Sequence, residues 1–115
     1  MIYFKPCVSD KNSAEITFEA IENDIACGKC DMTITDGKAV VDYIAYDEDK
    51  TYLVEGLLKS AFNYAAMKNV YMGYCKCENI THLLDRMNFQ KENSVYYNDI
   101  PSILQGNCCK KCDNI

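Results

Sequence analysis

The stretch AVVDYIAYDEDKTYLVEGLLKSAFNYAAMKNVYMGYC, residues 39–75, decides the fold of this chain. Its first eight residues, 39–46, are rich in β-branched and aromatic side chains, which is typical of a strand. Apolar residues then recur at steps of three and four from Leu53 to Ala65, as in a helix with one buried face. A further apolar run at 70–75 predicts another strand. Because a strand, a crossover helix and a strand form a βαβ unit, we expect the two strands to pair in parallel.

The segment before this unit predicts an antiparallel meander of three strands over residues 15–46. EITFEAIE at 15–22 alternates apolar with polar residues, which indicates a strand with one buried face. Turn-forming residues follow at 23–24 and again at 35–37, and each pair of neighbouring strands is therefore expected to form a hairpin.

The segment after the unit predicts a second helix and a closing hairpin. Apolar residues on one side of 79–87 indicate the helix, and 89–92 and 94–98 indicate the two hairpin strands. Pro101 is expected to open a short helical turn or loop. The complete order β, β, β, α, β, α, β, β predicts an α+β fold with a mixed, mostly antiparallel sheet.

Size and charge exclude several classes of protein. A chain of 115 residues, 49% of them hydrophobic, has room for one domain with a core. Seventeen acidic against 12 basic side chains give a formal charge of −5, which argues against nucleic acid or an anionic membrane surface as a partner. The sequence has no apolar run of spanning length and no signal-peptide pattern at its start, so we expect a cytoplasmic protein.

Four segments together resemble the GNAT superfamily of acyl-CoA N-acyltransferases over about residues 15–99. They are the strand that ends in Asp47 and Glu48, the helix EGLLKSAFNYA at 55–65, the strand VYMGY at 70–74, and LLDRMNF at 83–89 before the hairpin. Most suggestive are the paired Leu57 and Leu58, and the corner Met87, Asn88, Phe89 where the family usually has leucine, glycine and phenylalanine.

The resemblance implies where a cofactor would bind. In the family the two parallel strands splay apart, and the pantetheine arm of acetyl-CoA lies between them like an extra strand. The implied backbone contacts to the arm come from Ile44, Ala45 and Tyr46. The implied pyrophosphate site lies at the start of the central helix, at Lys50, Thr51, Tyr52 and Leu53, with Thr51 as the expected N-cap.

The implied reaction transfers the acyl group to a primary amine on a small molecule or a lysine. Glu48 is the candidate base, because the family often places acidic groups near this strand end. Cys75, next to the splay, is a candidate nucleophile that could take up the acyl group. Asp42 interrupts an apolar strand, so its carboxylate either faces solvent or lines the cleft. The only histidine, His82, is expected on the solvent side of its helix.

Two departures from the family pattern support a second hypothesis. The stretch DKTYLVE at 49–55 has no glycine, where the family has a glycine-rich phosphate loop. Leu84 stands where many members have a tyrosine that protonates the leaving thiolate. The alternative is therefore a GNAT-like module that binds a partner without catalysis.

Eight cysteines carry a third hypothesis, a thiol-rich metal or redox protein. They include the motifs CGKC at 27–30, CKC at 75–77 and CCKKC at 108–112. In an extended strand Cys27 and Cys30 project to opposite faces, and CGKC does not open a helix as a thioredoxin-type motif does. We predict mostly reduced thiols, no bound metal, and a cysteine-rich tail over 100–115 with the disorder usual for a terminus.

Overall fold

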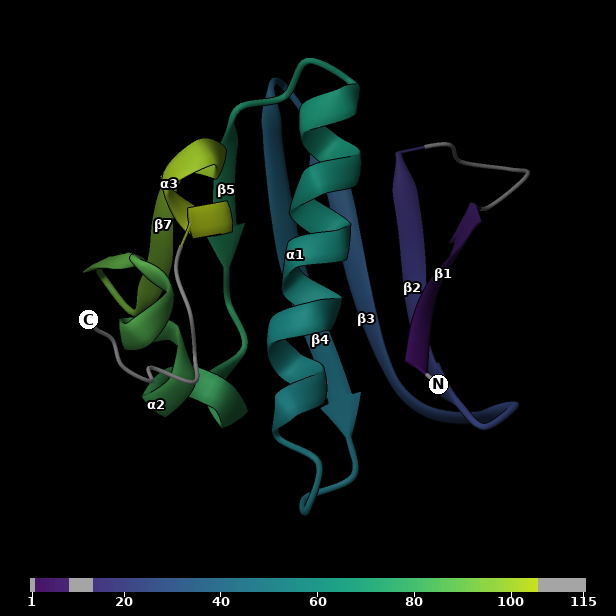
Figure 1. Cartoon of the computed structure of the whole chain (residues 1–115). Coiled ribbons are helices and arrows are strands. Elements are labelled where there is room, and N and C mark those ends of the chain that lie inside the picture. The colour runs from purple at the N-terminus through teal and green to yellow at the C-terminus, as the bar shows by residue number, and fades with distance from the viewer. Residues whose placement is uncertain (1, 9–13, 106–115) are drawn as a thin grey trace.

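The computed structural model of the chain describes residues 2–8 and 14–105 (Figure 1). The predicted order of elements is confirmed, and one strand is added at the N-terminal end. The elements are β1 (Ile2–Val8), β2 (Glu15–Glu22), β3 (Ile25–Thr35), β4 (Lys38–Tyr46), α1 (Tyr52–Met67), β5 (Met72–Cys75), η1 (Glu78–Ile80), α2 (Thr81–Leu84), η2 (Asp85–Met87), β6 (Gln90–Glu92), β7 (Val95–Asp99) and α3 (Ile100–Gln105).

All the strands of the described residues join one sheet in the order β1-β2-β3-β4-β5-β7-β6. β4 and β5 pair in parallel, and the other described neighbours pair antiparallel. The predicted α+β fold, with its mixed and mostly antiparallel sheet and its central βαβ unit, is therefore confirmed.

β1 was not predicted from the sequence, because Pro6 interrupts it. A proline cannot donate to a ladder and usually argues against a strand. β1 lies at the edge of the sheet and pairs only with β2 among the described strands, as Figure 1 shows. An edge position tolerates a proline whose missing N–H is on the unpaired side.

Both predicted hairpin turns are confirmed, and each has the left-handed backbone that such turns require. Asn23 and Asp24 join β2 to β3 with φ of 55° and 67°. Asp36 and Gly37 join β3 to β4 with φ of 51° and 75°. Two consecutive residues with positive φ match the twist of the flanking strands, and asparagine, aspartate and glycine adopt that conformation at the least cost.

The central helix lies across one face of the sheet, as Figure 1 shows for α1. Its predicted apolar stripe is buried and consists of Leu53, Val54, Leu57, Leu58, Ala61, Phe62 and Ala65. Thr51 does occupy the N-cap position, but its side chain makes no capping hydrogen bond. The backbone of Thr51 is helical, with φ −60° and ψ −20°, whereas a capping side chain normally needs an extended backbone.

The segment after β5 forms a helical run, η1, α2 and η2, where the sequence predicted one helix over 79–87. Asn88, with φ 65°, ends this run and leads into the β6–β7 hairpin. His82 is exposed, as expected. The short helical turn expected at Pro101 is confirmed as α3, and because Ile100 and Ile103 are fully buried, residues 100–105 belong to the fold and not to the predicted tail. The rest of the predicted tail lies outside the described residues.

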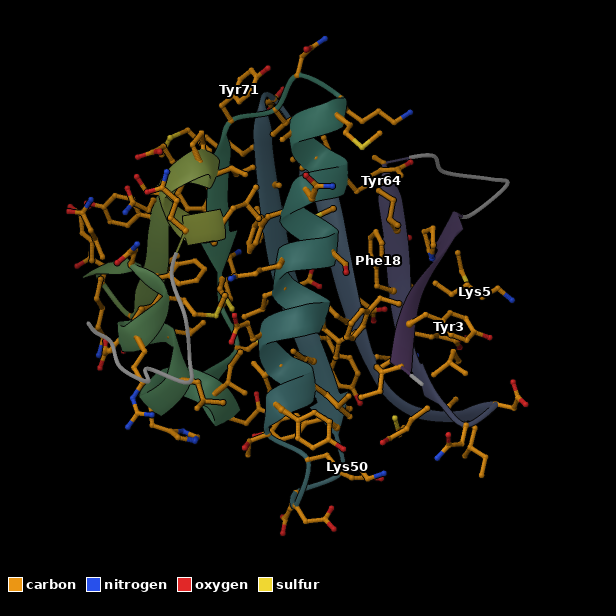
Figure 2. All side chains as sticks on the ribbon, viewed as in Figure 1. Tyr3, Lys5, Phe18, Lys50, Tyr64 and Tyr71 are labelled. Carbon is orange, nitrogen blue, oxygen red and sulfur yellow. The ribbon has the colours of Figure 1, made fainter. Side chains whose placement is uncertain are left out.

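The core lies between α1 and the sheet. Phe18 of β2 meets Tyr64 of α1 edge to face, with ring centroids 5.8 Å apart, and Figure 2 shows both side chains between these elements. Phe62 of α1 packs above β5, where Gly73 leaves room for its ring. These contacts hold α1 against β2 and β5.

Gly73→Ala is expected to lower the free energy of unfolding by about 1–3 kcal/mol through overpacking. A Cβ added at Gly73 would lie 2.7 Å from a ring carbon of Phe62 and 3.0 Å from Ile103. Urea unfolding would measure the loss. Gly28→Ala is the matched control, because there the nearest heavy atom is 3.2 Å away and the cost should be smaller. Equal stability of the Gly73→Ala variant and the wild-type protein would contradict the packing described above.

Candidate functional site

The two parallel strands separate after a short ladder. β4 and β5 pair from Lys38 and Met72 to Val41 and Cys75, and the amide of Lys76 adds one more bond to the carbonyl of Val41, at 2.9 Å. β4 continues to Tyr46, while the chain after β5 turns away toward α2, as Figure 1 shows. The splay expected from the resemblance is therefore present.

A β-bulge lies at the start of this splay. Asp31 of β3 pairs with Tyr43, and Met32 pairs with Val41, so Asp42 is the extra residue on β4. A bulge bends its strand and increases its twist. It also changes which backbone groups of β4 face away from β3. The bulge thus helps to open the gap beside β4.

Beyond the bulge, the backbone of β4 presents polar groups to the gap. The carbonyl of Ile44 accepts a hydrogen bond from Nδ2 of Asn79, at 3.2 Å, so it points away from β3. The amide of Asp47 points the other way, toward the carbonyl of Cys27 on β3, at 3.4 Å. Successive residues of a strand alternate in this respect, so the N–H and C=O groups of Ile44 and Tyr46 face the gap and those of Ala45 face β3. Of the three predicted backbone contacts, Ile44 and Tyr46 are the two whose polar groups face the gap.

A cleft of about 380 Å³ occupies this place. Its lining combines β4 with the segment that follows β5: Asp42, Tyr43, Ile44, Lys76, Cys77, Glu78 and Asn79. Asp42 is exposed to solvent, as the first of its two predicted placements has it, and it also lines this cleft. The sequence did not single out Lys76, Glu78 or Asn79, because their role depends on contacts with β4, more than 30 residues away.

Two thiols lie at the point of separation. Cys75 is fully buried and Cys77 is 6% exposed, and Sγ of Cys77 lies 3.8 Å from the carbonyl oxygen of Val41. Hydrogen bonding from Cys77 lowers the pKa of Cys75. The same contact, together with burial, raises the pKa of Cys77. Cys75 is therefore the member of the pair that ionises more readily, although Cys77 is the one that reaches the cleft.

The CGKC motif lies on β3 and does not join this pair in a metal site. Cys27 is partly buried and donates to the carbonyl of Ala20, at 3.5 Å, whereas Cys30 is fully buried and its pKa is raised by burial. All five cysteines of the described residues are free. In residues 2–8 and 14–105 no three cysteine, histidine or acidic side chains are placed to hold a metal ion. The CCKKC motif lies outside these residues.

The predicted pyrophosphate site lies at the start of α1, directly after the loop that follows β4 (Figure 1). Nζ of Lys50 is 2.9 Å from Oε1 of Glu22 on β2, and the hydroxyl of Tyr52 donates to the same oxygen at 3.2 Å. The hydrogen bond from Lys50 lowers the pKa of Glu22, and the bond to Glu22 raises the pKa of Lys50. Figure 2 shows Lys50 on this loop. The only cation of the loop is therefore engaged by a carboxylate.

The backbone amides at this helix start are also partly engaged. The amide of Leu53 donates to the carbonyl of Lys50 at 2.9 Å, and that of Val54 donates to the carbonyl of Thr51 at 3.1 Å. The first four amides of a helix have no partner within the helix and are the usual donors to a bound phosphate. Two of those four are used here by the loop itself. The side chain of Leu53 is fully buried and belongs to the core.

The structure does not bring the two predicted catalytic residues together. Cys75 pairs with Val41 at the start of the splay, whereas Glu48 follows the far end of β4. Glu48 is seven positions after Val41, which in an extended strand is roughly 20 Å. Asp42 and Glu78 are the carboxylates that line the cleft near the thiols, and the charge of Asp42 contributes to the raised pKa of Cys77.

The sequence matches no protein-family model and no curated protein. The structure does match solved acetyltransferase structures. The ribosomal-protein-S18-alanine N-acetyltransferase from Escherichia coli aligns over 87% of this chain and 94% of its own, with a TM-score of 0.70 and 12% identity. A candidate GNAT-family acetyltransferase from Desulfovibrio desulfuricans aligns over 87% and 99%, with a TM-score of 0.70 and 11% identity. A candidate N-acetyltransferase from Escherichia coli, bound to coenzyme A, aligns over 86% and 97%, with a TM-score of 0.68 and 11% identity.

These matches show that the chain has the GNAT fold, as the resemblance predicted. The alignments extend over almost the whole of the three matched structures. None of the helices in the described part of the chain has the length and apolar character needed to span a bilayer.

Proposed function

We propose that this protein binds an acyl thioester in the cleft beside β4 and transfers the acyl group to a primary amine. The observation that carries the proposal is the end of the β4–β5 ladder at Val41 and Cys75, beyond which backbone groups of β4 face a cleft. An extended, amide-bearing arm can add to such a strand edge through main-chain hydrogen bonds. Acetyl-CoA is the donor that the resemblance to the GNAT family predicts.

Ile44 and Tyr46 are the proposed anchors of the arm. The carbonyl of Ile44 already accepts from an amide, that of Asn79, so an amide of the arm is a suitable donor to the same oxygen. The side chain of Asn79 is exposed and can either move aside or share the carbonyl. In this position the arm would run along β4 toward the bulge at Asp42.

Asp42 is the proposed base, in preference to Glu48, because it lines the cleft at the bulge whereas Glu48 lies beyond the far end of β4. The protonated amine first releases one proton to solvent; its neutral nitrogen then forms a bond to the thioester carbonyl carbon and loses a second proton to Asp42. The C–S bond then breaks, and the sulfur leaves as a thiolate that solvent protonates. A positioned carboxylate that removes the proton makes the attack faster.

The acceptor is proposed to be a cationic amine, on a small molecule or a lysine side chain. Asp42 and Glu78 line the cleft together with the single cation Lys76, and the chain as a whole carries a formal charge of −5. Such a field attracts a protonated amine and repels anionic partners. Reduced thiols are typical of the cytoplasm, and the free cysteines of the described residues support the proposal that the protein works there.

Transient acylation of the Cys75 thiol is the alternative to this direct transfer. The lowered pKa of its thiol favours such a role, whereas its complete burial opposes it. Intact-mass measurement during turnover would detect an acyl group on the protein. Cys75→Ala is expected to retain amine acylation, because in the step proposed above the amine attacks the thioester directly.

The test is amine-dependent release of thiol from two donors, acetyl-CoA and acetyl-pantetheine, with a panel of small primary amines and a lysine peptide. The proposal predicts release that depends on both the amine and the protein. Binding of a donor without release would instead support the non-catalytic module that the glycine-free loop suggests. If neither donor binds at millimolar concentration, the proposed function is wrong.

A further inference from the structure

The start of α1 has the wrong charge for a diphosphate. Asp47, Glu48 and Asp49 are exposed on the loop, and Glu55 lies in the first turn of the helix. Glu22 approaches from β2. A helix N-terminus normally attracts anions, but carboxylates around it occupy that role and repel a further anion.

The lysines at this helix start are both paired with carboxylates. Lys50 contacts Glu22 at 2.9 Å, and Lys59 contacts Glu55 at 2.9 Å, one turn along the helix. A phosphate would have to compete with a carboxylate for either cation. Five named carboxylates against two lysines leave the region negative even with both pairs intact.

Close approach of the backbone is blocked as well. A phosphate cradle uses glycines, because a side chain keeps the backbone amides at a distance. The first glycine after the loop is Gly56, and the ring of Phe4 fills the space above it: an added Cβ would lie within 2.1 Å of that ring. The amides of Leu53 and Val54 already donate to the loop. The pyrophosphate of acetyl-CoA therefore does not fit this site.

From this mismatch we infer that the acyl donor is a thioester on a pantetheine-type arm that carries no nucleotide diphosphate. The inference rests on the proposed function, since it concerns the donor of that same reaction. The arm binds along β4 through uncharged hydrogen bonds at Ile44 and Tyr46. The acidic loop at 47–49 lies where a nucleotide would leave the cleft, and it selects against donors that carry one.

The sign of the salt dependence distinguishes this arrangement from an ordinary phosphate site. Salt screens charges at the surface. Screening weakens binding where lysines or helix amides attract a phosphate, and it strengthens binding where carboxylates repel one. With acetyl-CoA, kcat/KM should therefore rise between low salt and about 0.5 M salt, when the Debye length falls below about 8 Å. With acetyl-pantetheine, kcat/KM for the donor should stay constant when both donors are measured at saturating amine, so that screening of the attraction between the cationic amine and the acidic cleft does not enter.

The experiment compares the two donors with the same amine at low and at high salt. At low salt we expect acetyl-pantetheine to have a kcat/KM about tenfold higher than that of acetyl-CoA, a size consistent with a few partly screened charges near a protein surface. The affinities of the two donors, measured by calorimetry, should follow the same order, with acetyl-pantetheine bound more tightly than acetyl-CoA.

Glu22→Gln is the informative variant, because it frees Lys50 and removes one carboxylate. Glu22→Gln should raise kcat/KM with acetyl-CoA several-fold and leave kcat/KM with acetyl-pantetheine unchanged. Glu15→Gln is the matched control: it makes the same change of charge at the other end of β2, where Glu15 is exposed. This control variant should leave kcat/KM unchanged with both donors.

Each outcome decides the inference. A preference for acetyl-CoA that weakens with salt would overturn it and leave the proposed function standing. Activity with neither donor would end both together. If the protein prefers acetyl-pantetheine but Glu22→Gln does not reduce that preference, the carboxylates at the start of α1 are not what disfavours acetyl-CoA. This outcome would overturn the role assigned to the acidic loop.

Discussion

Phe62→Ala is expected to lower the free energy of unfolding by about 3–5 kcal/mol, the range for removing a buried aromatic ring. The side chain of Phe62 is fully buried. Its ring contacts that of Phe89 with centroids 6.0 Å apart, and it also fills the space left by Gly73 on β5. The substitution would leave a cavity between α1, β5 and the segment before β6.

Urea unfolding measures this effect, and Tyr71→Ala is the control. Tyr71 is 54% exposed, so loss of its ring should cost far less than loss of Phe62. The expected loss at Phe62 is a large part of the roughly 5–15 kcal/mol that stabilises a typical domain. The cleft exists only in the folded protein, and acyl transfer by Phe62→Ala should therefore fall with the folded fraction. If Phe62→Ala lowered the free energy of unfolding by less than Tyr71→Ala does, the packing described for Phe62 would be contradicted.

Asp42→Asn is expected to lower kcat for amine acylation by about 100-fold, as for loss of a general base. The carboxylate of Asp42 is exposed on the cleft, so the amide should fold normally but cannot accept the proton of the amine. The measurement is amine-dependent thiol release from acetyl-pantetheine at saturating amine.

Glu48→Gln is the matched variant for this test. It removes a carboxylate from the far end of β4, so we expect kcat to stay within about twofold of the wild-type value, as is usual for exposed side chains away from the chemistry. Full activity of Asp42→Asn together with an inactive Glu48→Gln would return the role of base to Glu48. Unfolding curves of both variants should match that of the wild-type protein, and this separates chemistry from stability.

Most of the fold could be predicted from local sequence patterns. The alternation in EITFEAIE, the turn residues Asn23 and Gly37, and the stripe from Leu53 to Ala65 each report a local backbone preference, and the structure follows them. β1 escaped prediction because Pro6 suppresses the strand signal, and only its edge position in the sheet makes it acceptable. The burial of Ile100 and Ile103, which makes α3 part of the fold, likewise depends on partners far along the chain.

The candidate site was predictable only in part. The family resemblance located the splay and its strand, but not which residues of β4 face the gap, because the bulge at Asp42 changes the alternation. The bond from Asn79 to Ile44 spans 35 residues, and no periodicity reports it. The pair Lys50 and Glu22, 28 residues apart, is another long-range contact, and it engages the cation that the resemblance placed at the pyrophosphate site.

The most direct test of the central claim is titration of ¹⁵N-labelled protein with acetyl-pantetheine, followed by NMR. Binding of the arm along β4 predicts the largest shifts at the backbone amides of Ile44 and Tyr46 and at the side-chain amide of Asn79, with small shifts at 47–49. Unchanged Ile44 and Tyr46 signals at millimolar ligand, or shifts confined to another surface, would contradict the claim that this strand edge is the donor site.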